Sequence, residues 1–290
     1  MKRILFASAL AAGFAVSLYA FDNDVSLKPL GGEREYTKTE YTITEKFGDY
    51  YRSPKARYSH VFDASGKETE SSELTSKGAV VDRIAYVYDA KGNLAEQVCT
   101  DADGKIQWKI SCSYDANGNK TEESEFNASD SLVNKTIWKI SDGKQVDESY
   151  YNADGALLSK IITKYDEKGR TGEVATYNAN GSLEQKAAYS YNDAGKLSEI
   201  AYSDPAAKLT HKTVFRFDAS YQITEEQTYD AENKLTVRII YKYDSNGNIT
   251  KKTTYNVAEK FGTTVNELAG IAEYSYGNGN ASAASSANAK

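Results

Sequence analysis

Hydrophobic and polar residues alternate along most of this chain in runs of about six to nine residues, and each run ends in a short turn sequence. In the turns an aromatic residue is followed by Asp or Asn, two variable residues and Gly, as in YDAKG, YDANG, YNADG and YDSNG. Asp or Asn opening a type I turn, with Gly in the left-handed position, is typical of a three-residue hairpin loop. The pattern therefore predicts β-strands joined by tight hairpins.

The spacing of the turns predicts the architecture. The residues before the turn Asp or Asn recur at intervals that alternate between 12 and 14 residues, with a single interval of 11, so the repeat is about 26 residues and contains two unequal strands. This predicts an all-β fold, a long antiparallel meander of about 12 to 16 short strands. Because an open twisted sheet of that size usually curls or splits, we expect a coiled or two-layered sheet.

A simple register test separates the two faces of this sheet. We paired Tyr114 with Lys120 across the hairpin and continued the pairing without interruption. One face then collects mainly apolar residues, among them Tyr86, Tyr88, Val98, Trp108, Ile110, Cys112, Tyr114, Phe126 and Trp138. The other face collects mainly polar residues, among them Gln97, Cys99, Lys109, Glu123, Glu125 and Lys135. The interval of 11 does not break the alternation, because SDGK at 141–144 predicts a two-residue turn that restores it.

The YDANGN stretch also has the look of a calcium loop. An EF-hand loop needs oxygen ligands at its first, third and fifth positions and a bidentate Glu at its twelfth. Asp115, Asn117 and Asn119 could fill the first three, but the twelfth position is Phe126. We therefore interpret these stretches as turns and predict neither a metal nor a cofactor.

The YDANGN, YDEKGR and YDSNGN turns, each followed by a strand, resemble the YD repeats of the RHS family, and YYNADGALLSK is similar to bacterial MORN-like repeat proteins. The resemblance covers roughly residues 62 to 255. It implies a long β-structure that coils or encloses a space and serves carbohydrate or surface interactions or toxin shells. The chain departs from the family in its two unequal half-repeats and in lacking an RHS core-type or toxin domain after them, so the resemblance supports architecture and leaves function open.

The ends of the chain differ from the repeats. Lys2 and Arg3 before an apolar run from Ile4 to Leu18 predict a secretory signal cleaved after Ala20, and hence an exported protein of the periplasm, cell surface or medium. The TVNE stretch at 264–267 suits a helix cap, but the residues after it could equally form a strand. We expect a signal peptide at 1–20, an N-terminal β cap at 21–60, a YD-type repeat domain at 61–256, a C-terminal cap of a short helix or strand at 257–277, and a disordered tail at 278–290.

An outer-membrane β-barrel is the main alternative for an exported chain of this kind. It is disfavoured because most predicted strands are shorter than the roughly 9 to 11 residues that span a bilayer, and because the polar face is highly charged. We therefore expect no membrane-spanning segment after signal cleavage. A net charge of -6 and a pI near 5.2 argue against nucleic acid as a partner. The oligomeric state is left open.

Two columns of charge recur at the repeat period. One, placed by the register test on the apolar face, contains Glu96, Glu122, Asp147, Glu173, Glu199 and Glu225. The other, placed on the opposite face, contains Lys109, Lys135, Lys160, Lys186, Lys212 and Arg238. Members of one column should lie about 9.6 Å apart, twice the strand spacing, which is too far for two carboxylates to share one calcium ion. The columns are either solvated rims or a repetitive groove, in which the acidic ladder would contact a ligand together with Trp108 and Trp138.

Residues for catalysis or cross-linking are scarce. His60 and His211 are the only histidines, and no serine elbow, phosphate loop or zinc spacing accompanies them. An exported chain usually pairs its cysteines, but the register places Cys99 opposite Gln107 on the polar face and Cys112 about 17 Å away on the apolar face. We therefore predict no disulfide, with Cys112 the more buried thiol.

Taken together, these features predict an exported, non-enzymatic β-repeat protein of the bacterial envelope or surface that binds a carbohydrate or an envelope protein. Two alternatives stay open. One is a structural or assembly component of the envelope. The other is a glycan hydrolase, which would need one special pair of carboxylates in a concave pocket.

Overall fold

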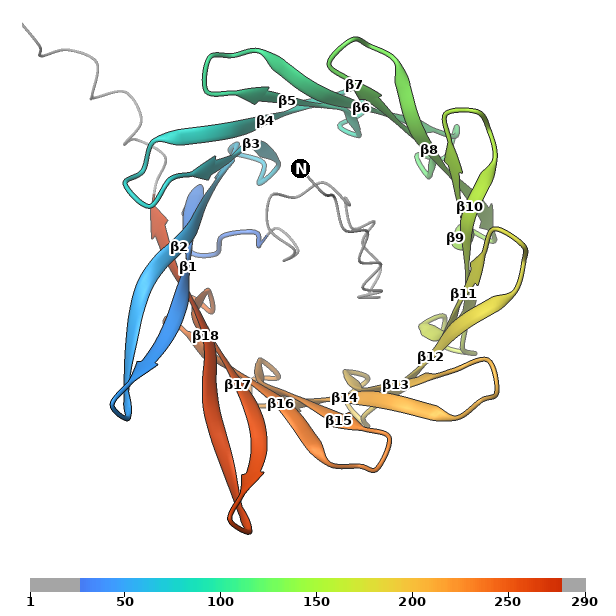
Figure 1. The fold of residues 1–290 in the computed structure, drawn as a ribbon. Coiled ribbons are helices and arrows are strands. Elements are labelled where there is room, and N and C mark those ends of the chain that lie inside the picture. Colours follow the sequence, from blue (N-terminus) through green and yellow to red (C-terminus); the bar gives the residue numbers. More distant parts are fainter. Residues whose placement is uncertain (1–26, 278–290) are drawn as a thin grey trace, which may run out of the picture.

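Residues 27–277 are described in the computed structural model of this protein. They form one antiparallel sheet of 18 strands that closes on itself, because the first strand pairs with both the second and the last. Viewed along its axis the sheet is a ring, with the strands following one another in sequence order (Figure 1). Within residues 27–277, no helix is long and apolar enough to cross a membrane.

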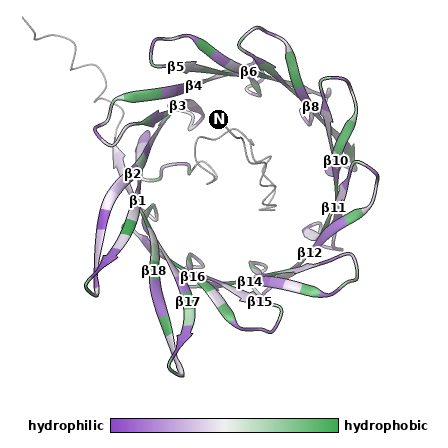
Figure 2. Cartoon of the chain, in the orientation of Figure 1, coloured by the Kyte–Doolittle hydropathy of each residue, from purple (hydrophilic) through white to green (hydrophobic). Residues whose placement is uncertain are grey.

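The strands are β1 (Glu35–Lys46), β2 (Asp49–Phe62), β3 (Glu68–Leu74), β4 (Val80–Tyr88), β5 (Leu94–Asp101), β6 (Ile106–Tyr114), β7 (Lys120–Asn127), β8 (Leu132–Ser141), β9 (Lys144–Asn152), β10 (Leu157–Tyr165), β11 (Thr171–Asn178), β12 (Leu183–Tyr191), β13 (Leu197–Ser203), β14 (Leu209–Phe217), β15 (Ile223–Asp230), β16 (Leu235–Tyr243), β17 (Ile249–Lys260) and β18 (Thr263–Gly277). Hydrophilic and hydrophobic residues alternate along them (Figure 2).

The all-β meander is confirmed, but the predicted coiled or two-layered sheet is wrong. The sheet has 18 strands rather than 12 to 16, and it closes into a barrel. Closure comes from the segments expected to be caps. Residues 35–62 form β1 and β2, residues 263–277 form a strand rather than a helix, and β1 pairs with β18 from Glu35 to Tyr41. Closure removes the two unpaired edges that a sheet of this length would otherwise expose. The expected signal peptide and the expected disordered tail lie outside the described residues.

The turn chemistry is as the sequence predicts. In the YDANG turn the Asp115 backbone N–H donates to the Asn119 carbonyl, and the Gly118 N–H donates to the Asp115 carbonyl. The Asp115 carboxylate accepts hydrogen bonds from Asn119 and Asn117, which lower its pKa. Asp142 and Gly143 both have positive φ, as the predicted two-residue turn requires. The aspartates of these turns therefore accept hydrogen bonds from backbone N–H groups and stabilise the turn conformation.

The aromatic residue before each turn has a second structural role. The Tyr114 hydroxyl donates to the backbone carbonyl of Leu94, 20 residues earlier, at 2.9 Å. The same bond recurs for Tyr88, Tyr165, Tyr191 and Tyr243, each to the carbonyl 20 residues before it. These five tyrosines lie near one rim of the barrel, and each links the end of its own strand to the start of the preceding strand. We call this set the tyrosine ring.

Every short strand carries a β-bulge. Because of these bulges, side chains of the short strands lie on the face opposite to the one predicted. Ser113 pairs with Glu122 and Tyr114 with Lys120, so Thr121 is the extra residue. A second shift, between Glu125 and Phe126, leaves Val133 of β8 as an extra residue and restores the predicted alternation along β8. The predicted faces therefore hold for the long strands but are inverted in the short ones. Lys109, for example, lies opposite Phe126 and not Glu125.

Candidate binding surfaces

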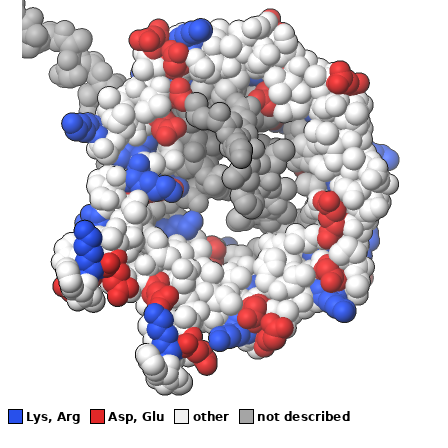
Figure 3. All heavy atoms as spheres, viewed as in Figure 1, with Lys and Arg blue, Asp and Glu red and all other residues white. Residues whose placement is uncertain are grey.

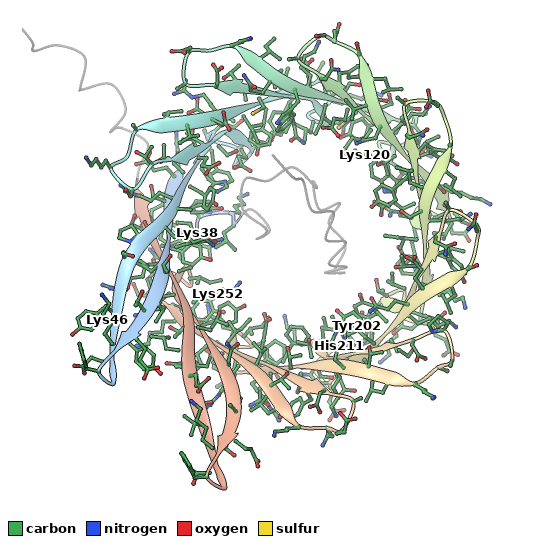
Figure 4. All side chains as sticks on the ribbon, in the orientation of Figure 1. Lys38, Lys46, Lys120, Tyr202, His211 and Lys252 are labelled. Atoms are coloured by element: carbon green, nitrogen blue, oxygen red, sulfur yellow. The ribbon has the colours of Figure 1, made fainter. Side chains whose placement is uncertain are left out.

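The inner and outer faces of the barrel differ in chemistry. Lys120, Tyr202 and His211 lie on the inner side of the ring (Figure 4). Since directly paired residues share a face, the register assigns the remaining side chains. The inner face carries most of the aromatic residues and also the buried hydrophobic cluster of Val174, Ala187, Tyr189, Ile200 and Phe215. The outer face carries both predicted charge columns.

The two columns lie on one face and neutralise each other. This corrects the prediction that they occupy opposite faces, and the cause is the bulge that turns each short strand over. The ion pairs have N–O distances of 2.5 to 3.7 Å and join Lys135 to Glu122, Lys160 to Asp147, Lys186 to Glu173, Lys212 to Glu199, and Arg238 to Glu225. Arg83 and Glu70 continue the series, whereas Lys109 bonds Asp130 instead. Glu96 faces the same side. We call this set the charge belt.

The acidic column that was predicted to contact a ligand and the two tryptophans predicted to assist it lie on opposite faces of the barrel. Trp108 pairs with Cys99, and Trp138 pairs with Glu148, so both indoles share the inner face with these residues. The acidic column lies on the outer face. The structure therefore does not bring the carboxylates of the ladder and the tryptophans together on one surface.

Single members of the charge belt should contribute little to stability. Glu173 accepts from Lys164 at 2.9 Å and lies 3.6 Å from Lys186, and its pKa is lowered chiefly by the Lys164 hydrogen bond. We expect Glu173→Gln to reduce the free energy of unfolding by about 0.2 to 1 kcal/mol, because the pairs are solvent-screened. Urea denaturation at low and high salt measures this, and the difference should shrink as salt rises. A loss that is large and insensitive to salt would contradict the screened belt.

Inner-face carboxylates were missed by the sequence reasoning, which placed Glu123 and Glu125 on the polar side. Glu123 is 6% exposed, bonds the Lys120 ammonium, and lies 3.9 Å from the Cys112 thiol. The Lys120 ammonium also lies 4.6 Å from the centre of the Trp138 ring. An acid, a base and an indole thus meet on β6, β7 and β8. No periodicity in the sequence marks this cluster, because the bulge alone turns Glu123 inward.

Two further carboxylates face inward beside tyrosines. Glu148 accepts from the Tyr150 hydroxyl and from Gln145 at 3.1 Å. Glu226 accepts from the Tyr241 hydroxyl at 2.8 Å. Each carboxylate is held next to an aromatic ring, so the inner face offers a hydrogen-bond acceptor beside a flat apolar surface at both places.

The Tyr202 and His211 rings stack on the inner face, with centroids 4.2 Å apart and planes 10° apart (Figure 4). Burial lowers the pKa of His211, which favours the neutral imidazole. The pair presents a flat aromatic surface.

The cysteines are free thiols, and both point inward. Cys99 is buried and Cys112 only partly so, which reverses the predicted order because the bulge moves Cys99 to the inner face. Burial raises the pKa of the Cys112 thiol, so it is protonated at neutral pH and a weak nucleophile. Among residues 27–277, no group of three or more His, Cys, Asp and Glu side chains could hold a metal ion.

Comparison with known proteins yields only low-scoring structural similarities. No protein-family model matches this chain, and no curated protein matches it. A porin-like protein from Bacteroides uniformis is 10% identical, with a TM-score of 0.48, over 86% of this chain and 99% of that one. A porin-like protein from Bacteroides vulgatus is 12% identical, with a TM-score of 0.33, over 71% and 98%. A TcdB2–TccC3–Cdc42 structure is 13% identical, with a TM-score of 0.31, over 85% of this chain and 16% of that one. The resemblance to RHS repeats stays a prediction.

Proposed function

We propose that this chain is an exported, non-enzymatic β-barrel of the bacterial envelope that binds a carbohydrate on its inner face. One observation carries the proposal: inner-face carboxylates stand beside aromatic rings at separate places around the barrel, as at Glu148 with Trp138 and at Glu226 with Tyr241. Sugars present apolar ring faces and rows of hydroxyls, which suit flat aromatic side chains and carboxylate acceptors. The expectation of export rests on the N-terminal sequence, which lies outside the described residues.

The outer ladder is a weaker candidate for the same role. Most of its carboxylates form an ion pair with a lysine or arginine of the neighbouring long strand. A ligand hydroxyl would have to displace a charged partner there. We therefore move the proposed contact from the ladder to the inner face.

The absence of catalysis is part of the proposal, and the chemistry of the site favours it. A hydrolase needs one carboxylate poised as an acid and another as a base or nucleophile. Glu123, Glu148 and Glu226 are instead each held by a neighbouring lysine, glutamine or tyrosine. These three carboxylates therefore act as hydrogen-bond acceptors and do not form an acid and base pair.

Fluorescence provides the test, because Trp108 and Trp138 are the only tryptophans and both face inward. Soluble gluco-, manno- and N-acetylglucosamine oligosaccharides are titrated into the purified chain, and we expect one class to shift the emission saturably. Glu148→Gln should weaken that binding about tenfold, because a charged acceptor loses its charge. Glu122→Gln on the outer face is the matched control and should leave it unchanged. No shift with any sugar, or equal losses in the two variants, would contradict inner-face binding.

A structural or assembly role is the second candidate. It is favoured by two hairpins that flare away from the ring, β1–β2 and β17–β18 (Figure 1). Their tips carry exposed aromatic residues, Phe47 and Phe261, that contribute nothing to the barrel core. Such tips are suited to attachment rather than to carbohydrate binding on the inner face.

A further inference from the structure

The two flaring hairpins end in the same four residues, Glu-Lys-Phe-Gly, at 45–48 and at 259–262. Lys46 pairs with Asp49 in the first hairpin, and Lys260 pairs with Thr263 in the second. Each tip is therefore a two-residue turn made of Phe and Gly. The hairpins belong to neighbouring parts of the ring, because β1 pairs with β18.

The phenylalanines occupy unfavourable positions. Phe47 and Phe261 have φ of 56° and 52°, with the following glycines at 85° and 75°, which is the geometry of a type I′ turn. The first position of such a turn favours Asn, Asp or Gly, and a bulky residue is strained there. Both rings are fully exposed, at 104% and 106%. An aromatic side chain at these two positions opposes folding and gains no packing in return.

The tips project well beyond their neighbours. β3 pairs with β2 only as far as Arg57, so residues 49–56 extend past it by roughly 26 Å at about 3.3 Å per residue. β16 pairs with β17 only as far as Asn256, so residues 257–260 extend past it by roughly 13 Å. Both hairpins leave the outline of the ring on the same side (Figure 1). The two phenylalanines are therefore accessible to a membrane or a protein partner that approaches this rim.

Acidic and basic residues adjoin the exposed phenylalanine at each hairpin tip. Lys46 stands between Glu45 and Asp49, and Lys260 follows Glu259 and bonds Glu267. Basic and acidic side chains adjoin on both hairpins (Figure 3). Two half-exposed tyrosines, Tyr50 at 47% and Tyr51 at 54%, follow on β2. In the first hairpin, the exposed Phe47 is therefore followed, away from the tip, by charged side chains and then by two tyrosines, whose rings are apolar and whose hydroxyls are polar.

We propose that the Phe47 and Phe261 tips insert together into the surface of a lipid bilayer with zwitterionic headgroups. This order of groups matches a bilayer interface, where apolar groups enter the acyl boundary while tyrosines and lysines stay at headgroup level. A zwitterionic headgroup offers an anion and a cation to the mixed charges of each tip. Two tips of identical sequence find the same environment in a bilayer, whereas a protein partner would need two matching pockets. The inference is independent of sugar binding on the inner face.

Two weak anchors on one rigid barrel should act together. One tip that inserts holds the other at a high effective concentration near the surface. Removing one ring should therefore weaken binding about tenfold, and removing both should abolish it at the same lipid concentration.

The experiment is flotation of the purified full chain with vesicles of phosphatidylcholine and phosphatidylethanolamine. Phe47→Asn, Phe261→Asn and the double variant remove the rings, and Asn followed by Gly is a favoured type I′ pair, so the barrel keeps its fold. Tyr221→Asn is the matched control. Tyr221 is an aromatic turn residue with φ of 61° and 52% exposure, and it lies on the opposite rim, in the β14–β15 turn.

We expect the wild-type chain and Tyr221→Asn to float, each single variant to float weakly, and the double variant to stay at the bottom. Flotation of the double variant would overturn the proposal. So would flotation that requires anionic lipid and disappears in high salt, since charge and not the rings would then bind. A wild-type chain that ignores vesicles but captures an envelope protein through the two rings would also overturn it, and would make the tips anchors for a protein.

Discussion

Replacing Tyr36 by Ala should lower the free energy of unfolding by about 3 to 5 kcal/mol, among the larger effects of a single change in this barrel. Tyr36 is 2% exposed and lies in β1, which pairs with β2 on one side and β18 on the other. Its ring stacks on His60 with centroids 4.4 Å apart, and lies 6.1 Å from Phe62 and 5.8 Å from Tyr276. The truncation leaves a cavity at the seam, where the first and last strands meet.

Urea denaturation followed by circular dichroism measures this change, and the midpoint should fall while the slope is kept. Tyr36→Phe keeps the ring and loses only the hydroxyl that accepts from the Leu27 N–H, so it should cost about 1 kcal/mol. Tyr51→Ala at an exposed site should change stability by less than about 0.5 kcal/mol. Equal effects at Tyr36 and Tyr51 would refute the role of the seam.

The barrel should also lose stability steeply as the pH rises from about 10 to about 12. Burial raises the pKa of Tyr88, Tyr114 and Tyr243 to about 12, from an ordinary value of 10.0. Each neutral hydroxyl donates to a backbone carbonyl, which a phenolate cannot do. The unfolded chain releases these protons near pH 10 while the folded chain holds them. The contribution is therefore complete below pH 10 and is lost as the pH passes through about 12.

Parallel measurements of unfolding free energy and tyrosinate absorbance against pH test the tyrosine ring. The triple change of Tyr88, Tyr114 and Tyr243 to Phe should lower stability at neutral pH and flatten the alkaline decline. Phe217 already occupies the equivalent position in β14, so the ring position accepts Phe. An alkaline decline as steep in the triple variant as in the parent would show that other groups cause it.

The sequence predicted the turns and the long strands well, because their signals are local. Asp and Gly at fixed offsets determine each turn, and the alternation within β6 or β8 determines which residues face the core. The faces of the short strands could not be derived this way. A bulge such as the one at Thr121 adds one residue without any distinctive residue type, and it inverts the positions from Glu122 to Asn127.

Closure depends on long-range pairing, which no local pattern records. The seam joins Glu35 to Gly277, and neither flanking segment carries the repeat signature. The charge columns were found because they recur at a fixed interval. Their pairing was missed because the predicted faces of the short strands were inverted. The inner cluster around Glu123 was missed for the same reason.

The antiparallel seam restricts how a barrel of this kind can change in size. β1 and β18 can pair in this sense only if the number of strands is even. A unit of about 26 residues supplies two strands, so a tandem duplication or an in-frame deletion of one unit preserves closure, while loss of half a unit does not. The circumference of such a barrel can therefore change only by whole hairpins of two strands. Relatives of this chain should differ in length by whole repeat units.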